Sequence, residues 1–326
     1  MSKRVVFRCS FGERDGWGHV VRCSALAQEF LDRSWETFLW SEGNLLSLPE
    51  EIAKAFTGVQ EHAKVESDIL VVDEMYTPQE RLEAVVEEWR GFNRRGIVAG
   101  VDDMQRRSMA GFDLVLNTEI GLAAGAYQVD VSLLGESFAL LRSGFRKPAE
   151  LTATHEFAGH APVLVMIGGT DAFGFLPRVL EALSDIGSTS IAPVVVSPHE
   201  VDLQAFGAGR VLRRISSAEM AAWMRFCSLG IIGCGSSLYE AAAMELPFVG
   251  LSIVDNQTAT ARKVQSLWGM PVFHFEESEA GDLQALAGSV QALLVRDRVP
   301  YSKVDTKGAS RVVDALEVLL AKRSSR

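Results

Sequence analysis

The sequence predicts an α/β protein of two domains, each built around a parallel sheet. Apolar runs of about five residues alternate with helix-length amphipathic stretches, which is typical of βα units. The chain has 326 residues, more than one ordinary hydrophobic core supports. Hydrophobic residues make up 48% and charged residues 23%, so two sizeable cores can form. We expect an N-terminal domain over residues 1–147 and a C-terminal domain over residues 148–326.

In the first domain, short apolar runs indicate strands and the stretches between them indicate helices. The clearest helices are Val20–Leu31 and Pro78–Trp89, the second with Thr77 as a candidate N-cap. The predicted strands are Arg4–Arg8, Thr37–Trp40, Ile69–Val72, Ile97–Val101 and Leu114–Leu116.

The second domain repeats the alternation after an irregular stretch. This stretch starts at Leu133 and carries two prolines, which indicates a connection between domains. The repeat predicts a second Rossmann-like unit. A last amphipathic segment, Ala309–Ala321, can pack against either domain, including back onto the first. The predicted strands are Val163–Ile167, Val194–Val196, Leu229–Ile232 and Phe248–Leu251, with helices near Ser217–Arg225 and Ser236–Met244.

Charge and cysteine content narrow the possible partners. Lys and Arg total 32 against 42 for Asp and Glu, a formal net charge of −10, which repels nucleic acid at long range. No apolar run approaches the roughly 18 residues of a membrane span, and the N-terminus lacks a signal-peptide pattern. The four cysteines form no CxxC pair and suit a reducing compartment. We expect a cytoplasmic protein that binds neither nucleic acid nor membranes, with its oligomeric state left open.

Three turns rich in glycine follow predicted strands. The sequence GWGH at residues 16–19 opens the first helix, GCGSS at 233–237 opens a helix in the second domain, and GGTD lies at 168–171. Backbone N–H groups at such turns bind anions, although glycine there can equally serve tight helix-to-strand packing. Three such turns at the carboxyl ends of parallel strands favour a cleft that faces a phosphorylated ligand.

NAD binding is an alternative use of the first turn. A dinucleotide fingerprint requires a third glycine, and this chain has Val21 at that place. Glu42 lies at a tolerable distance for a ribose contact, but the missing glycine disfavours NAD. A Walker A loop is absent from the sequence.

His19 is the candidate general base. It stands in the first turn of a helix, where the helix dipole disfavours the imidazolium and should keep the ring neutral and able to accept a proton. The alternative is that His19 only caps or packs. His155 and His160 are five residues apart, about 140° around a helix, so we expect no zinc site there. Asp102 and Asp103 could hold a metal, but capping or hydrogen bonding is an equal expectation.

The order of these motifs carries a resemblance. Matching segments lie at residues 16–23, 101–103, 133–146, 167–171, 235–240, 246–247 and 255–257, over most of the chain. In them the sequence resembles the UDP-sugar hydrolase of the pseudaminic acid pathway, which releases 2,4-diacetamido-2,4,6-trideoxy-altrose from UDP. It is also similar to the lipid II-forming N-acetylglucosaminyltransferase. The resemblance implies a GT-B fold, in which two Rossmann-like domains face a central cleft, and chemistry without a cofactor or metal.

The resemblance also implies roles for individual residues. His19 and Asn256 would be catalytic, with His19 activating water for attack on the anomeric carbon while UDP leaves. Residues that would bind the nucleotide are Gly235, Ser236, Ser237, Glu240 and Gly169. Residues that would bind the sugar are Gly18, Tyr76, Asp255 and Gln257.

Two departures from the family lie near the expected sugar site. The family usually has an Asp soon after its first strand, where this chain has RCSFG at residues 8–12, and its Asp-x-Tyr motif is replaced by DEMY at 73–76. The identity of the sugar is therefore open. The leading expectation is a UDP-sugar hydrolase. The alternatives are an inverting glycosyltransferase, in which His19 would deprotonate an acceptor hydroxyl, and a catalytically silent sugar-nucleotide sensor.

Overall fold

The structure is a computed structural model. It describes residues 2–12, 17–41, 48–60, 66–74, 77–103, 105, 107–122, 124–152, 154–168, 174–186, 191–253, 257–274, 281–295, 298 and 300–325. The chain forms two compact units. Unit 1 comprises Met1–Ser143 and Thr306–Arg326, and unit 2 comprises Gly144–Asp305.

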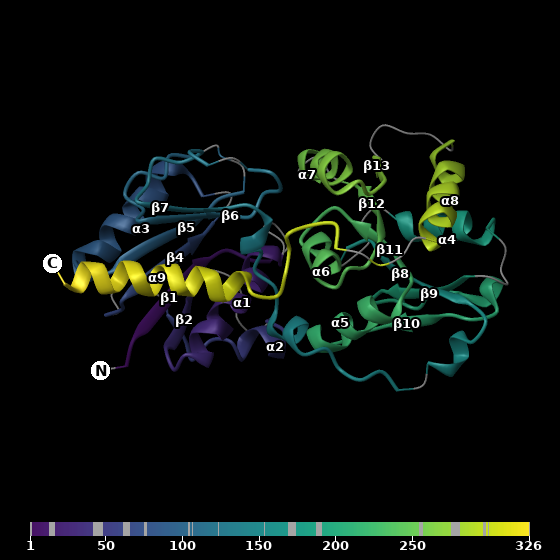
Figure 1. Ribbon diagram of the computed structural model, residues 1–326. Helices are drawn as coiled ribbons and strands as arrows, with labels where there is room; N and C mark the ends of the chain where they lie inside the picture. Colours follow the sequence, from purple (N-terminus) through teal and green to yellow (C-terminus); the bar gives the residue numbers. More distant parts are fainter. Residues whose placement is uncertain are drawn as a thin grey trace. The chain divides into compact units, whose positions relative to one another are not determined.

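Unit 1 contains, among its described residues, a seven-stranded sheet in the order β3-β2-β1-β4-β5-β6-β7 (Figure 1). All neighbouring strands are parallel, and the strand order reverses between β1 and β4. The strands are β1 (Arg4–Cys9), β2 (Glu36–Trp40), β3 (Gly58–Gln60), β4 (Ile69–Asp73), β5 (Ile97–Val101), β6 (Leu114–Asn117) and β7 (Val131–Leu134). The helices are α1 (Gly18–Asp32), α2 (Glu50–Ala53), α3 (Gln79–Phe92) and α9 (Gly308–Ser324).

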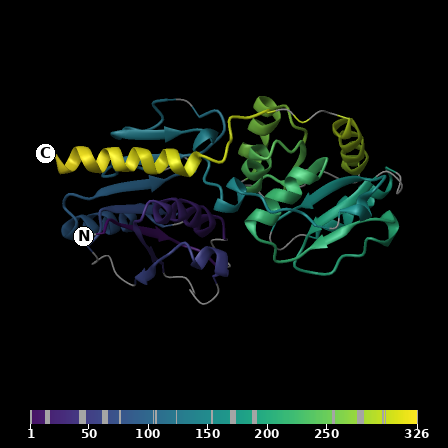
Figure 2. The same ribbon diagram turned by 60° about the horizontal axis from the view of Figure 1, so that its bottom comes forward.

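Both faces of this sheet are covered, which explains why its strands are apolar throughout. Val5 and Phe7 of β1 point to one core, which α1 and α9 share, whereas Val6 points to the other core, with Trp89 of α3. The last helix, α9, lies along the sheet of unit 1 (yellow in Figure 2). Its Leu316 is fully buried in the α1 core. Side chains of β1 therefore alternate between the two cores, and those near its carboxyl end belong to one face or the other.

The five strands predicted in this half are confirmed, and the short strands β3 and β7 were not predicted. β7 includes Leu133, so the irregular connection begins later than expected. The prediction that Thr77 caps α3 is wrong. The N-cap is Pro78 and makes no side-chain cap, while the Thr77 hydroxyl donates to Glu74 Oε2 at 2.9 Å.

The described part of unit 2 contains a six-stranded parallel sheet in the order β10-β9-β8-β11-β12-β13, which reverses between β8 and β11. The strands are β8 (Ala161–Met166), β9 (Ile191–Val196), β10 (Arg210–Leu212), β11 (Leu229–Gly233), β12 (Phe248–Ser252) and β13 (Val272–His274). The helices are α4 (Phe175–Ser184), α5 (Ser217–Phe226), α6 (Ser237–Ala243), α7 (Thr258–Lys263) and α8 (Gly281–Leu294).

One core of unit 2 lies between this sheet and the helices α4 and α8, which the sequence did not predict. Val163 of β8 and Ile231 of β11 pack there against Val179 of α4 and Val290 of α8. Each unit is thus a doubly wound sheet with one reversal of strand order. Ligands of such sheets bind outside the carboxyl ends of the strands at the reversal.

Candidate functional site

In unit 1, the reversal of strand order brings the predicted base beside an acid that was not predicted as a site residue. β1 and β4 are neighbours, with Cys9 paired to Asp73, the last residue of β4. Helix α1 follows β1 and begins at the exposed Gly18, so His19 is its second residue. Both side chains therefore lie at the carboxyl edge of the sheet, at the point where its topology predicts a ligand.

His19 is held by a short, buried hydrogen bond. Its Nδ1 lies 2.7 Å from Asp73 Oδ1, and the two residues are 7% and 1% exposed. Arg22 Nη2 also lies 3.1 Å from His19 Nδ1, but a guanidinium can only donate. If Nδ1 carried no proton, its lone pair would face the negative charge of the Asp73 carboxylate. In the neutral ring the proton therefore lies on Nδ1, which leaves the Nε2 lone pair that a general base needs.

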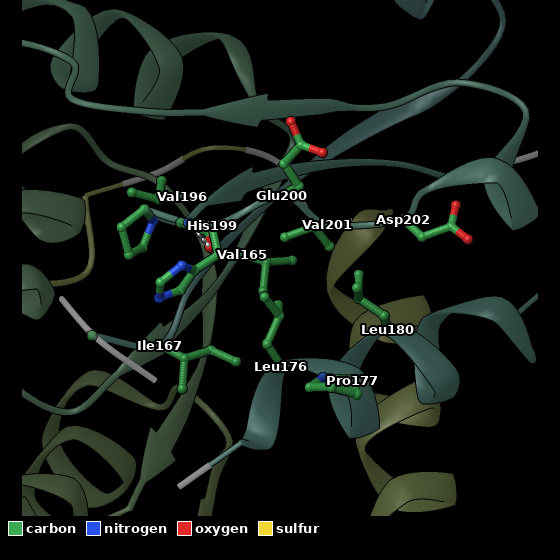
Figure 3. A pocket seen from close by; sticks show the side chains of 13 residues that line it. Val165, Ile167, Leu176, Pro177, Leu180, Val196, His199, Glu200, Val201 and Asp202 are labelled. Atoms are coloured by element: carbon green, nitrogen blue, oxygen red, sulfur yellow. Dashed lines mark hydrogen bonds between the residues drawn. The ribbon is translucent and has the colours of Figure 1, made fainter. Parts of the chain in front are cut away.

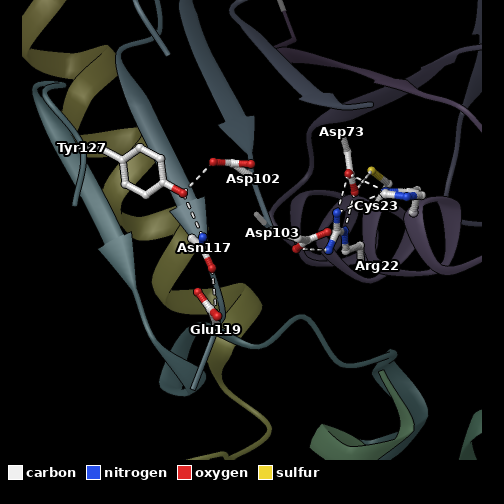
Figure 4. A network of polar contacts seen from close by, with 9 residues as sticks. Arg22, Cys23, Asp73, Asp102, Asp103, Asn117, Glu119 and Tyr127 are labelled. Carbon is white, nitrogen blue, oxygen red and sulfur yellow. Dashed lines mark hydrogen bonds and ion pairs between the residues drawn. The ribbon is translucent and has the colours of Figure 1, made fainter. Parts of the chain in front are cut away.

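Arg22 bridges two carboxylates around this dyad (Figure 4). It grips Asp73 in a bidentate pair, from Nε to Oδ2 and from Nη2 to Oδ1, and its Nη1 donates to Asp103 Oδ1 at 2.7 Å. Burial would raise the pKa of the Asp73 carboxyl, but the charges and hydrogen bonds of Arg22 and His19 together hold that pKa well below its usual range. Asp73 is therefore an anion at neutral pH.

The two acids of the predicted Asp102-Asp103 pair have different partners. Asp103 binds Arg22, whereas Asp102 Oδ2 accepts from the Tyr127 hydroxyl at 2.7 Å (Figure 4). Asn117 Nδ2 donates to the same hydroxyl. These contacts support the hydrogen-bonding interpretation of the pair. Among the described residues, no cluster of three or more His, Cys, Asp or Glu side chains could hold a metal ion.

A second ion pair lies on the other side of β4. Arg8 Nε is 2.6 Å from Glu74 Oε1, both residues are buried, and the Arg8 guanidinium stacks over Trp40. Arg8 lies on the face of the sheet that α3 covers, as Val6 does. Asp73 and Cys9 lie on the opposite face, which α1 covers. These are the two places where the chain departs from the pattern of the family that its sequence resembles, and here Arg8 and Glu74 contact each other.

In unit 2, the corresponding reversal holds the second glycine turn. A Cβ on Gly233 would lie 2.9 Å from the backbone oxygen of Ile167, so only glycine allows β11 to end this close to β8. Gly235 and Ser236 are exposed, Ser237 is half-buried and Glu240 is buried. Ser236 is the N-cap of α6 without a side-chain cap, which leaves its hydroxyl unused by the helix.

Gln257 is placed beside this turn. Its Nε2 would be 3.9 Å from a Cβ on Gly235, and its Oε1 accepts from the backbone N–H of Ile253 at 3.0 Å. The predicted site residues Gly235, Ser236 and Gln257 thus lie close together. The predicted Tyr76, Gly169, Asp255 and Asn256 lie outside the described residues.

A largely apolar cavity of about 630 Å³ opens next to Gly168, the residue that follows Ile167 after β8 (Figure 3). The apolar Ile167 and Leu176 and the polar His199 and Glu200 are among the residues that line it (Figure 3). A cavity of this size and polarity is typical of a small-molecule site. Sequence reasoning missed it because α4 was not predicted.

Solved structures share this architecture over the whole chain. MurG of Acinetobacter baumannii superposes with a TM-score of 0.65 at 12% identity, covering 97% of this chain and 99% of that one. The chain has the GT-B fold. LpCGTa, solved in complex with UDP, superposes with a TM-score of 0.62 at 13% identity over 99% of each chain. The predicted fold class is confirmed.

A sequence relative adds to this picture. The chain is 26% identical over 278 residues to the spore coat polysaccharide biosynthesis protein SpsG of Bacillus subtilis (strain 168), which covers 77% of this chain and 78% of SpsG. No known family profile matches the chain. In the described part of the chain, no helix is both long and apolar enough to cross a membrane.

Proposed function

We propose that this chain is a nucleotide-sugar hydrolase that acts on a UDP-sugar. The observation that carries the proposal is the His19–Asp73 dyad at the strand reversal of unit 1, with Nδ1 bonded to a buried carboxylate 2.7 Å away. Such a pair orients the ring and fixes the tautomer in which the other nitrogen accepts a proton. The likeness to a polysaccharide biosynthesis protein and to a fold that binds UDP in LpCGTa supports the substrate class.

In this proposal His19 Nε2 removes a proton from water as the water oxygen attacks the anomeric carbon. The bond between that carbon and the diphosphate oxygen breaks, and the electron pair leaves with UDP. The proton stays on His19 as an imidazolium, which the Asp73 anion stabilises. A single displacement of this kind inverts the configuration at the anomeric carbon.

The nucleotide would bind unit 2. The exposed Ser236 offers a backbone N–H and a hydroxyl to the diphosphate, and the buried Glu240, in the first turn of α6, is proposed to hold the ribose. The N–H of Gly235 donates to the Gly233 carbonyl oxygen at 2.8 Å, so Gly235 would act by leaving room for the diphosphate. The apolar cavity beside Gly168 is the place we propose for the flat uracil ring, because Ile167 and Leu176 give it an apolar lining. Tyr76, Asp255, Asn256 and Gln257 remain proposed sugar or diphosphate contacts.

The test is turnover without an acceptor. The full chain is incubated with a panel of UDP-sugars in water, and free sugar and UDP are measured by chromatography. Equal amounts of sugar and UDP support the proposal. Release of UDP only after an acceptor alcohol is added would exclude hydrolysis.

Glycosyl transfer is the second candidate, because MurG and the calicheamicin glycosyltransferase CalG4 share the fold, CalG4 with a TM-score of 0.60 at 13% identity over 98% of each chain. His19 would then deprotonate an acceptor hydroxyl by the same chemistry. Turnover in ¹⁸O-labelled water separates the two, because hydrolysis places the label in the sugar whereas transfer does not.

A further inference from the structure

The dyad of His19 and Asp73 is surrounded by charges that the mechanism above does not use. Among the residues that the structure describes, the titratable and charged groups that contact this dyad or its partners are Arg22 and Cys23 on α1, Cys9 on β1, and Asp103 after β5. Asp73 Oδ1 accepts from both His19 and Arg22. Any change in Arg22 therefore acts directly on the carboxylate that holds the catalytic ring.

The Cys23 thiol contributes no charge to this cluster. A hydrogen bond with Cys9, then burial and the nearby Asp73 anion, raise the pKa of Cys23 well above its ordinary value. Cys23 Sγ lies 3.6 Å from Asp73 Oδ2 as a neutral donor. The balance of charge is thus set by Arg22 and the two carboxylates.

We propose that Arg22 and Asp103 are a positioning pair that sets how readily the His19–Asp73 dyad takes up a proton, and so the pH range of the reaction. With His19 neutral, Asp73, Arg22 and Asp103 sum to one negative charge. Protonation of His19 brings the cluster to neutrality. Without Arg22 the cluster carries two negative charges and holds the proton more tightly, whereas without the charge of Asp103 it holds the proton less tightly.

The geometry adds a second task for Arg22. Its bidentate grip fixes the rotation of the Asp73 carboxylate, so that Oδ1 faces His19. A lysine keeps the charge but cannot make two parallel hydrogen bonds. Substitution can therefore separate the charge of Arg22 from its bidentate hydrogen bonding. Asp103 has a third of its side chain exposed, so solvent screens its influence and its effect is the smaller one.

The experiment measures the titration midpoint of the His19 ring by NMR on the full chain with labelled histidine, the signal being assigned with His19→Gln. We expect Arg22→Met to move the midpoint up and Asp103→Asn to move it down by a smaller amount. Arg22→Lys should stay within a few tenths of the parent chain, yet lose about tenfold in kcat because the ring is less well held.

The proposal is overturned if Arg22→Met and Asp103→Asn move the midpoint in the same direction, or if neither moves it. Should Arg22→Met fail to fold, Asp103→Asn alone decides, since an unmoved or raised midpoint contradicts the pair. The inference rests on the proposed function for its consequence in catalysis, but the titration needs no substrate. Shifted midpoints without turnover on any UDP-sugar would reject the hydrolase and keep the pair. Turnover with unmoved midpoints would keep the hydrolase and reject the pair.

Discussion

The candidate sites at the two strand reversals of this chain are built from different kinds of groups. In unit 1 the site is made of charged side chains, with His19 and Arg22 of α1 meeting Asp73 at the end of β4. In unit 2 the candidate site is a glycine turn, in which Gly233 ends β11 and Gly235 and Ser236 precede α6. The same topology thus places a group that can accept a proton in one unit and an open glycine turn with the Ser236 hydroxyl at a helix start in the other.

This difference predicts that unit 1 supplies the catalytic groups and that unit 2 binds the nucleotide. A proton acceptor must be oriented and its charge balanced, which requires buried side-chain partners. A diphosphate is recognised largely by backbone N–H groups and hydroxyls, and residues with small side chains let it come close to them. Substitutions in unit 1 should therefore affect turnover with little effect on nucleotide affinity, and substitutions in unit 2 should do the opposite.

The largest effect is expected from His19→Ala. Loss of the general base should lower kcat for UDP-sugar hydrolysis by about 10² to 10⁴, while UDP binding, measured by calorimetry, stays within about twofold because unit 2 holds the nucleotide. His155→Gln, an exposed histidine in unit 2, is the matched control and should retain full activity. Loss of UDP affinity in His19→Ala would break the proposed division.

Asp73→Asn should be the next largest, as a loss of stability. The substitution removes the charge of one of the two carboxylates that Arg22 contacts, while the guanidinium stays largely buried. We expect a cost of about 3 kcal/mol at pH 7. Burial opposes ionisation of Asp73, but Arg22 and His19 lower its pKa overall. A carboxyl with a lowered pKa stabilises the fold above its unfolded pKa near 4, and this contribution is lost as the pH falls further.

The difference in unfolding free energy between the parent chain and Asp73→Asn should therefore shrink below about pH 4, which urea unfolding at pH 7, 5 and 3 measures. Asp314→Asn is the control, because this exposed acid pairs with Arg33 in the same unit and should cost less than about 1 kcal/mol. An equal penalty for Asp73→Asn at pH 3 and pH 7 would contradict the lowered pKa.

The fold and part of the candidate site could be predicted because they follow local patterns. Buried strands are apolar runs, and GWGH and GCGSS at strand ends are visible in the sequence. The role of Asp73 was missed although the residue directly follows a predicted strand. Its contact with His19 depends on β4 lying next to β1, and the 53 residues between His19 and Asp73 give no local sign of that pairing. The pair of Arg8 and Glu74 was missed for the same reason.

The glycines of unit 2 allow the scaffold to be separated from the ligand site. Gly233→Ala should destabilise unit 2 by about 1–3 kcal/mol, because its Cβ would meet backbone, which cannot easily move away. Gly235→Ala has open space around its Cβ, with Gln257 Nε2 nearest at 3.9 Å, and should leave stability unchanged but weaken UDP binding about tenfold. Thermal unfolding with and without UDP reports both quantities. Equal losses of stability in the two variants would show that Gly235 serves packing alone.

The smallest expected effect concerns the cavity beside Gly168. Leu176→Trp would fill part of the cavity of about 630 Å³ and should weaken UDP binding by about fivefold, or about 1 kcal/mol. Pyrophosphate has no base, so its binding should be unchanged, and Leu176→Met, which keeps the volume, is the control. Calorimetric titration with both ligands measures the difference. If the tryptophan weakens pyrophosphate as much as UDP, the cavity does not hold the base and the turn at Gly235 must account for all of the affinity that unit 2 provides.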